Sequence, residues 1–336
     1  MSSIKTVNKL IIFMTILFAL SGLFTVLDTI NQRLEFQARS ASLMEQVESY
    51  NFENRDFFKT ANNSEPLPHD EEMGSACESL ITAFENFENA NSYYSEAEGY
   101  IRGSVFGYSL YVDLFFKRAL YPNGDFYQEV FASERGDRFG GRVGAMLMYY
   151  SYEEDKVYYN FTWDTEKIST TEYRPNYSES SWTVKTIQDI TGSSSTSLNI
   201  PLYDVTKGNI INEHYFSTKR NNKNQVEEYY SQVSLSAIDS TNRYRRLSEN
   251  IVSAIRPDAI RGINFQEVTM SAVIGSDGNL NTVNVNDKFQ ARAYVYFLGI
   301  NLNINAESNV NYLYSSINSD IDIERPEIPE SVKNNK

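Results

Sequence analysis

The stretch NFQEVTMSAVIGSDGNLNTVNVND, residues 264–287, contains the pattern that decides the fold class. It predicts two strands on either side of GSDGN (275–279), in which Asp277-Gly278 is a dipeptide that favours a hairpin turn. KFQARAYVYFLGINLNINAES (288–308) and NVNYLYSS (309–316) continue in the same manner. The sequence therefore predicts a meander of long antiparallel strands in this half of the chain.

A helix is predicted before these strands, from about Ser240 to Ile255, and Pro257 stops it. The first half of the chain has the same order of elements. Ser75 and Glu78 form a helix-capping pattern, the predicted helix ends near Asn91, and strand-like sequence follows. Asn123-Gly124 fits a two-residue hairpin turn in that region.

The segment GAMLMYYSYEEDKVYYNFTW, residues 144–163, predicts a further hairpin with Glu153–Lys156 as its loop. One face of this hairpin is apolar and the other is mixed, which is typical of an antiparallel sheet that is covered on one side. The apolar face consists of Met146, Met148, Tyr150 and Tyr152 on one strand and Val157, Tyr159, Phe161 and Trp163 on the other.

The N-terminal region contains a long uncharged stretch, residues 10–27, behind Lys5 and Lys9. Its length as a helix, about 27 Å, is close to the thickness of a bilayer core. We expect an uncleaved signal anchor, although cleavage after residues 19–21 is an alternative. The two lysines place residues 1–9 in the cytoplasm and the bulk of the chain outside the plasma membrane.

The predicted organisation is α+β. After the cytoplasmic tip (1–9) and the transmembrane anchor (10–27) come a helical stalk and linker (28–74). Two helix-plus-curved-antiparallel-sheet units follow, at 75–190 and 191–325, and residues 326–336 are predicted to be a disordered tail. The boundary between the units is placed at the Ser- and Thr-rich region around GSSSTS (192–197).

Composition limits the possible functions. The net charge of −14 and the pI near 4.7 argue against nucleic-acid binding, which needs a basic surface. The single cysteine, Cys77, rules out an intramolecular disulfide. Aromatic residues make up 14% of the chain, including 24 tyrosines, which favours extensive sheet faces or aromatic-lined grooves. No zinc, phosphate-loop, dinucleotide or nucleophile-elbow motif is present, so no cofactor, metal or catalytic residue is predicted.

Two groups of residues are candidates for binding. The first lines the apolar face of the 144–163 hairpin, where flexible methionines and aromatic rings could hold an apolar ligand; these residues also suit an ordinary core. They are Met146, Met148, Tyr150, Tyr159, Phe161 and Trp163. The second is the glycine-rich segment ERGDRFGGRVG (134–144), whose Arg135, Arg138 and Arg142 could hold an anion or a lipid headgroup. A flexible charged loop explains the same segment.

The run YYSQVSLSAIDSTNRYRRLSENI (229–251) with the strands of 263–304 resembles membrane-anchored proteins of Gram-positive and wall-less bacteria. The layout is similar to the half-barrel of LolA- and LppX-type lipoprotein or lipid carriers, in two copies over about 75–325. This resemblance implies a concave sheet closed by helices that holds an acyl chain. The chain departs from it by its predicted anchor and by the absence of a lipidated cysteine.

We therefore expect a membrane-anchored extracytoplasmic protein that binds an apolar or lipid ligand in a sheet-lined cavity. The alternative is a structural or interaction module, either a surface scaffold or a subunit of a membrane complex, with a filled core and a protein partner in the envelope. An envelope hydrolase with dispersed carboxylates is a third possibility.

Overall fold

The structure is a computed structural model of the chain. It describes residues 76–105, 108–136, 142–162, 165–167, 173–175, 177, 182–191, 203–245, 260–295, 300–321 and 325–333. The predicted tip, anchor, stalk and linker, residues 1–74, lie outside these ranges. Among the described residues, no helix is long and apolar enough to cross a bilayer.

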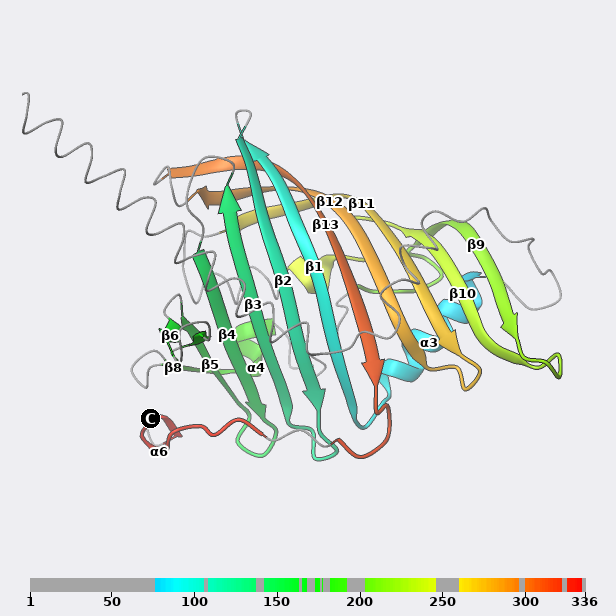
Figure 1. Ribbon diagram of the computed structural model, residues 1–336, viewed down its shortest axis with the longest axis horizontal. Coiled ribbons are helices and arrows are strands. Elements are labelled where there is room, and N and C mark those ends of the chain that lie inside the picture. Colours follow the sequence, from blue (N-terminus) through cyan, green and yellow to red (C-terminus); the bar gives the residue numbers. More distant parts are fainter. Residues whose placement is uncertain are drawn as a thin grey trace, which may run out of the picture.

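A single antiparallel sheet dominates the described chain (Figure 1). Eleven strands form it, in the order β8-β5-β4-β3-β2-β1-β13-β12-β11-β10-β9, and β6 pairs with β7 in a small separate ribbon. The strands on the N-terminal side are β1 (Tyr93–Val105), β2 (Tyr108–Leu120), β3 (Phe126–Gly136), β4 (Arg142–Ser151), β5 (Lys156–Thr162), β6 (Thr165–Lys167), β7 (Tyr173–Pro175) and β8 (Trp182–Thr186). Those on the C-terminal side are β9 (Ile210–Arg220), β10 (Val226–Leu235), β11 (Ile260–Gly275), β12 (Leu280–Val295) and β13 (Ile300–Ser315).

The predicted division into two helix-plus-sheet units is wrong, because the two halves share one sheet. Each half is a meander, as predicted, but β1 of the first meander pairs with β13 of the second. This seam runs from Tyr94 opposite Ser315 to Ser104 opposite Asn305. Each meander alone would leave one of these strands with unpaired backbone groups, and the pairing satisfies both edges. Few helices accompany the sheet: α3 (Ala76–Glu88), α4 (Ile187–Thr191) and α6 (Glu330–Lys333).

The seam is closest at Gly99. A Cβ atom at this position would lie 2.3 Å from the carbonyl oxygen of Asn309 and 2.8 Å from Cα of Val310. Only glycine lets the two backbones approach in this way.

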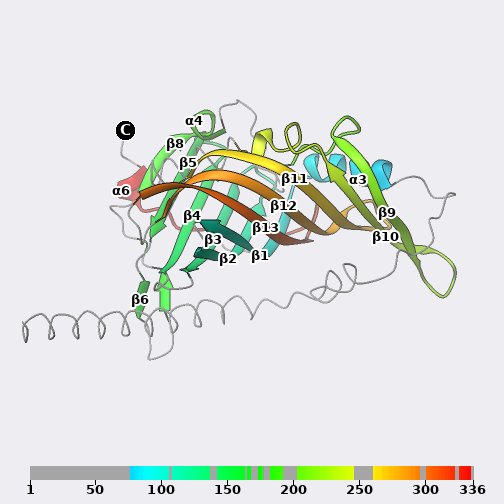
Figure 2. The same cartoon turned by 90° about the horizontal axis from the view of Figure 1, so that it is seen from above.

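Helix α3 lies against one face of the sheet, which we call the inner face; the opposite face is the outer face. The helix was predicted from its apolar spacing, and that spacing places Leu80, Ala83, Phe84 and Phe87 in the core. Phe87 contacts the rings of Tyr93 and Tyr314, each with a centroid distance of 4.7 Å. Figure 2 shows the curvature of the sheet, with α3 and α4 on the same side of it.

Both predicted turn dipeptides lie in hairpins. In the first, three residues, Pro122 to Gly124, separate Tyr121 from its backbone partner Asp125, instead of the predicted two. Gly124 adopts φ of +91°, a left-handed conformation that glycine adopts without steric cost. In the second, Gly278 adopts φ of +78° between β11 and β12.

The C-terminal residues cover part of the outer face. Ile328 and Val332 pack on Tyr158 of β5, and all three are at least 94% buried. Residues 326–336 were predicted to be a disordered tail, but those that the structure describes, 326–333, form a short segment ending in α6. The sheet is consequently covered on both sides near β5, rather than on one side as the hairpin pattern predicted.

Side-chain amides hold the outer face together on β12 and β13. Asn284 donates to Asn309 and Asn311 at 3.0 and 2.6 Å, and Asn286 donates to Asn284 at 2.6 Å. The NVN repeats in the two strands therefore form one cross-strand network.

Candidate functional site

The hairpin chosen from the sequence forms with the predicted faces but with a different register, because Lys156, which was predicted to lie in the loop, begins β5 and pairs with Ser151. Met146 pairs with Phe161, Met148 with Tyr159 and Tyr150 with Val157. Met148, Tyr150 and Tyr159 belong to the main core, with at most 4% of each side chain exposed, and Met146 is 9% exposed. They therefore lie in the packed interior. Phe161 is half-buried, Tyr152 is in the turn with 57% exposure, and Trp163 is outside the described residues.

The three arginines proposed as an anion site are only partly described. Arg135 is the penultimate residue of β3, opposite Tyr111, and Arg142 begins β4, opposite Glu134. Arg138 and the side chains of the other two lie outside the described part of the structure.

A different arginine, Arg118 of β2, lies on the inner face. Only 4% of it is exposed, and its Nε donates to Oε1 of Gln128 at 2.9 Å. Its guanidinium carbon is 5.1 Å from the ring centroid of Phe116 and 5.7 Å from that of Tyr312. Both of these residues pair with Ala97 of β1. The charged group therefore occupies the space that the small side chain of Ala97 leaves open.

Arg118 is buried without a counter-ion. Among the described residues no carboxylate forms an ion pair with it, and its Nη1 is buried with no hydrogen-bond partner. The hydroxyl of Tyr93, also on the inner face, is likewise buried without a partner in the described chain. Burial raises the pKa of Tyr93, and the charge of Arg118 opposes that rise.

A second buried charge, Asp287 of β12, also lies on the inner face. Its two carboxylate oxygens accept hydrogen bonds from Tyr203 at 2.6 Å and Ser308 at 2.7 Å. Burial raises its pKa to about 6, although both hydrogen bonds favour the charged form. The ring of Tyr203 is in turn stacked on Tyr244, with centroids 5.5 Å apart.

Sequence reasoning missed both groups, although a signal exists. On β2 the inner-face positions read Val112, Leu114, Phe116, Arg118, Leu120, and on β12 they read Val283, Val285, Asp287, Phe289, Ala291. A charge at a position that the two-residue period assigns to the apolar face is the detectable feature.

The inner face is not equally covered along its length. Under α3 it is closed: Val233, Met270 and Val283 have no exposed surface. On β1, β2 and β3, beyond α3, the inner-face apolar side chains are only half-buried: Ile101, Val112, Leu114 and Val130. Small residues, Ala97, Gly99 and Gly103, occupy the same face of β1.

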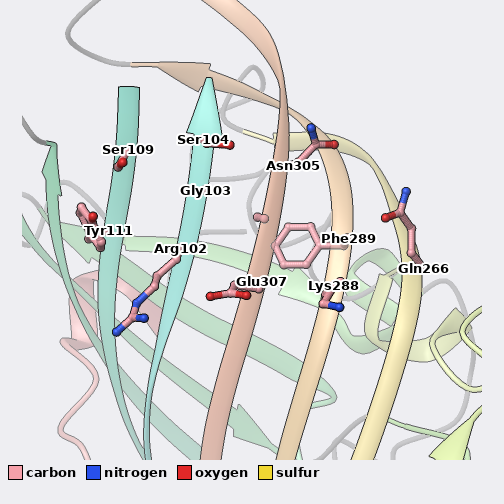
Figure 3. A pocket seen from close by; sticks show the side chains of 11 residues that line it. Arg102, Gly103, Ser104, Ser109, Tyr111, Gln266, Lys288, Phe289, Asn305 and Glu307 are labelled. Carbon is pink, nitrogen blue, oxygen red and sulfur yellow. The ribbon is translucent and has the colours of Figure 1, made fainter. Parts of the chain in front are cut away.

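A pocket of about 370 Å³ lies on the outer side of the sheet, where β1, β2, β11, β12 and β13 contribute (Figure 3). Most of its side chains are polar, and its cations already have partners. Arg102 lies 4.2 Å from the ring centroid of Tyr100, and Lys288 pairs with Glu267 at 2.6 Å. The pocket is large enough for a small molecule.

Comparisons with known proteins place the chain only loosely. No protein-family model matches it, and no curated protein matches it. The crystal structure of a DUF1329 family protein from Desulfovibrio piger is similar with a TM-score of 0.24 and 11% identity, over 77% of this chain and 99% of that one. A candidate AttH from Nitrosomonas europaea gives a TM-score of 0.14 and 11% identity, over 71% of this chain and 72% of that one. Likeness at this level does not extend to function.

Proposed function

We propose that this protein is a non-catalytic binding protein that holds an apolar ligand, such as a lipid acyl chain, against the inner face of its sheet. The ligand lies on β1, β2 and β3, beyond the part of the face that α3 covers. In this proposal the N-terminal residues 10–27 anchor the chain in a membrane and the sheet works on the outer side.

The observation that carries the proposal is the uneven cover of the inner face. The half-buried residues Ile101, Val112, Leu114 and Val130 form an apolar area next to the small residues of β1. An alkyl chain placed there gains about 0.8 kcal/mol for each methylene group removed from water. Twelve methylenes contribute about 10 kcal/mol, which is comparable to the loss of free motion on binding, roughly 4–15 kcal/mol.

Only part of the resemblance to LolA- and LppX-type carriers is used in this proposal. It applies to one curved antiparallel sheet with helices on its inner face, and not to two half-barrels. It supports the choice of an acyl chain as the apolar ligand.

A binding titration tests the function. The full-length chain is stripped of bound lipid and titrated with 1-hexadecanol, an uncharged long-chain probe, by calorimetry. Val112→Trp places an indole on the proposed surface, and we expect it to weaken binding at least ten-fold. Gln290→Trp, at an exposed outer-face position of β12, is the matched control and should bind as the unaltered chain does.

The alternative function, a structural or interaction module, is favoured by the closed packing under α3. There Leu80, Val233 and Met270 have no exposed surface, as expected for a filled core. The same titration separates the two functions. If hexadecanol does not bind, or if Val112→Trp binds it unchanged, the scaffold remains and the ligand-binding proposal fails.

A further inference from the structure

Arg118 is an unusual residue for the interior of a sheet protein. A buried charge is costly unless it is paired, and buried arginines ordinarily meet a carboxylate. Here the side chain has two neutral hydrogen-bond partners, Gln128 and Tyr312, together with the faces of two aromatic rings. Two buried polar groups, Nη1 of Arg118 and the hydroxyl of Tyr93, have no partner in the described chain.

These two groups are neighbours on the inner face. Ser95 is directly opposite Arg118, and Tyr93 is the next residue of β1 on the same face. The charge of Arg118 lowers the pKa of both Tyr93 and Tyr312 against the effect of burial, so all three groups share one environment. A ligand oxygen that reached Nη1 would find a second donor in the tyrosine hydroxyl.

We infer that Arg118 receives the carboxylate of a long-chain fatty acid, with Tyr93 as a second donor to it. This inference rests on the proposed function and names its ligand class. A carboxylate supplies the single negative charge that the arginine lacks and accepts hydrogen bonds from both unpartnered groups. A phosphate monoester carries more than one negative charge near neutral pH, and one arginine would leave part of that charge buried and unpaired.

The alkyl chain has a path along β2. The inner face continues from Arg118 through the half-buried Phe116 and Leu114 to Val112. Six residues of strand span about 20 Å, which matches an extended chain of about sixteen carbons. On β1, Val310 occupies the space beside Gly99. The acid group therefore lies at the buried end and the alkyl chain runs toward the less covered part of the face.

The experiment compares two ligands of equal chain length, palmitate and 1-hexadecanol, on the lipid-stripped full-length chain. We expect palmitate to bind at least ten-fold more tightly. Arg118→Met keeps an unbranched apolar side chain and removes the charge. It should reduce palmitate affinity at least ten-fold and leave hexadecanol affinity unchanged, while Tyr93→Phe should have a smaller effect of the same kind. Arg292→Met, an exposed arginine of β12, is the matched control.

The outcomes separate this inference from the proposed function. If both ligands bind equally and Arg118→Met changes neither, the acid site is absent while apolar binding stands. If neither ligand binds, both proposals fail. Tighter binding of hexadecyl phosphate than of palmitate would replace the carboxylate with a phosphate ligand and overturn the assignment. If Arg118→Met fails to fold, two measurements still test the inference. One is the comparison of palmitate with hexadecanol on the unaltered chain, and the other is the same comparison on Arg118→Lys, which keeps the charge.

Discussion

The regions around Asp287 and Arg118 both bury a charge on the inner face of the sheet, but they satisfy it differently. Asp287 has a hydrogen-bond donor on each carboxylate oxygen, Tyr203 on one and Ser308 on the other. Arg118 has two neutral partners, Gln128 and Tyr312, and its Nη1 has no hydrogen-bond partner among the described residues. A buried charged group whose polar atoms all have hydrogen-bond partners needs nothing beyond the folded chain. A buried donor without a partner among the described residues is the basis on which we propose a ligand at Arg118.

The largest expected effect concerns the pH dependence of stability at Asp287. The folded chain holds this proton up to about pH 6, above the ordinary value of 3.8. Between these values the folded state binds more protons than the unfolded state, so stability falls as pH rises, by roughly 3 kcal/mol in total. Asp287→Asn should remove that fall. Urea unfolding at pH 4, 5, 6 and 7 measures it, with Glu153→Gln in an exposed turn as the control.

The second prediction compares two buried tyrosines. Tyr203→Phe removes a donor from a buried carboxylate, which should cost about 1–3 kcal/mol of unfolding free energy at pH 7.5 and less at pH 4, where Asp287 is protonated. Tyr93→Phe removes a hydroxyl without a partner in the described chain and should cost nothing. Equal losses in the two variants, measured by urea unfolding, would contradict the distinction between the regions.

The third prediction concerns Arg118 in the absence of ligand. Replacing a buried charge with an apolar side chain of similar length is often stabilising. We expect Arg118→Met to raise the unfolding free energy by about 1 kcal/mol. Thermal unfolding of the ligand-free chain checks this, against Arg292→Met, which should change stability by less than about 0.5 kcal/mol. A clear loss of stability would mean that the arginine supports the fold in the way Asp287 does.

The smallest effect is expected next to Asp287, on the opposite face. Lys288 pairs with Glu267 at 2.6 Å, but the two side chains are 56% and 65% exposed. Hydrogen bonding to Glu267 raises the pKa of Lys288. Exposed pairs of this kind contribute little to stability and are screened by salt. A double-mutant cycle with Lys288→Gln and Glu267→Gln should find a small coupling at low salt that disappears at high salt.

Local features of the fold could be predicted from the sequence. The apolar spacing of α3 and the two glycine turns follow from short-range rules, and so do the faces of β4 and β5, although Val157 pairs with Tyr150 and not with Tyr152 as the predicted loop required. The joining of the two meanders could not be predicted, because the backbone edges of β1 and β13 carry no side-chain signature and lie about 200 residues apart. Two separate sheets and one shared sheet have the same alternation of residues.

The residues predicted to bind a ligand lie in a different part of the inner face from Arg118. Met148 and Tyr150 stood out in the sequence because large flexible and aromatic side chains suit both a cavity and a core, and the structure places them in the core. Arg118 and Asp287 are better indicators, because a charge within an apolar row has no use in ordinary packing. Their different partners depend on residues from other strands, which the sequence does not bring together.

The pairing of β1 with β13 also affects how the chain is made. During synthesis β1 leaves the ribosome early, but its partner strand follows only after some two hundred further residues. Until then β1 has an unpaired edge, which favours wrong contacts between nascent chains. We therefore expect the last step of maturation to be slow, since contacts between distant segments form late. We expect that two fragments produced by cutting the chain between the meanders can reassemble through the hydrogen bonds between β1 and β13.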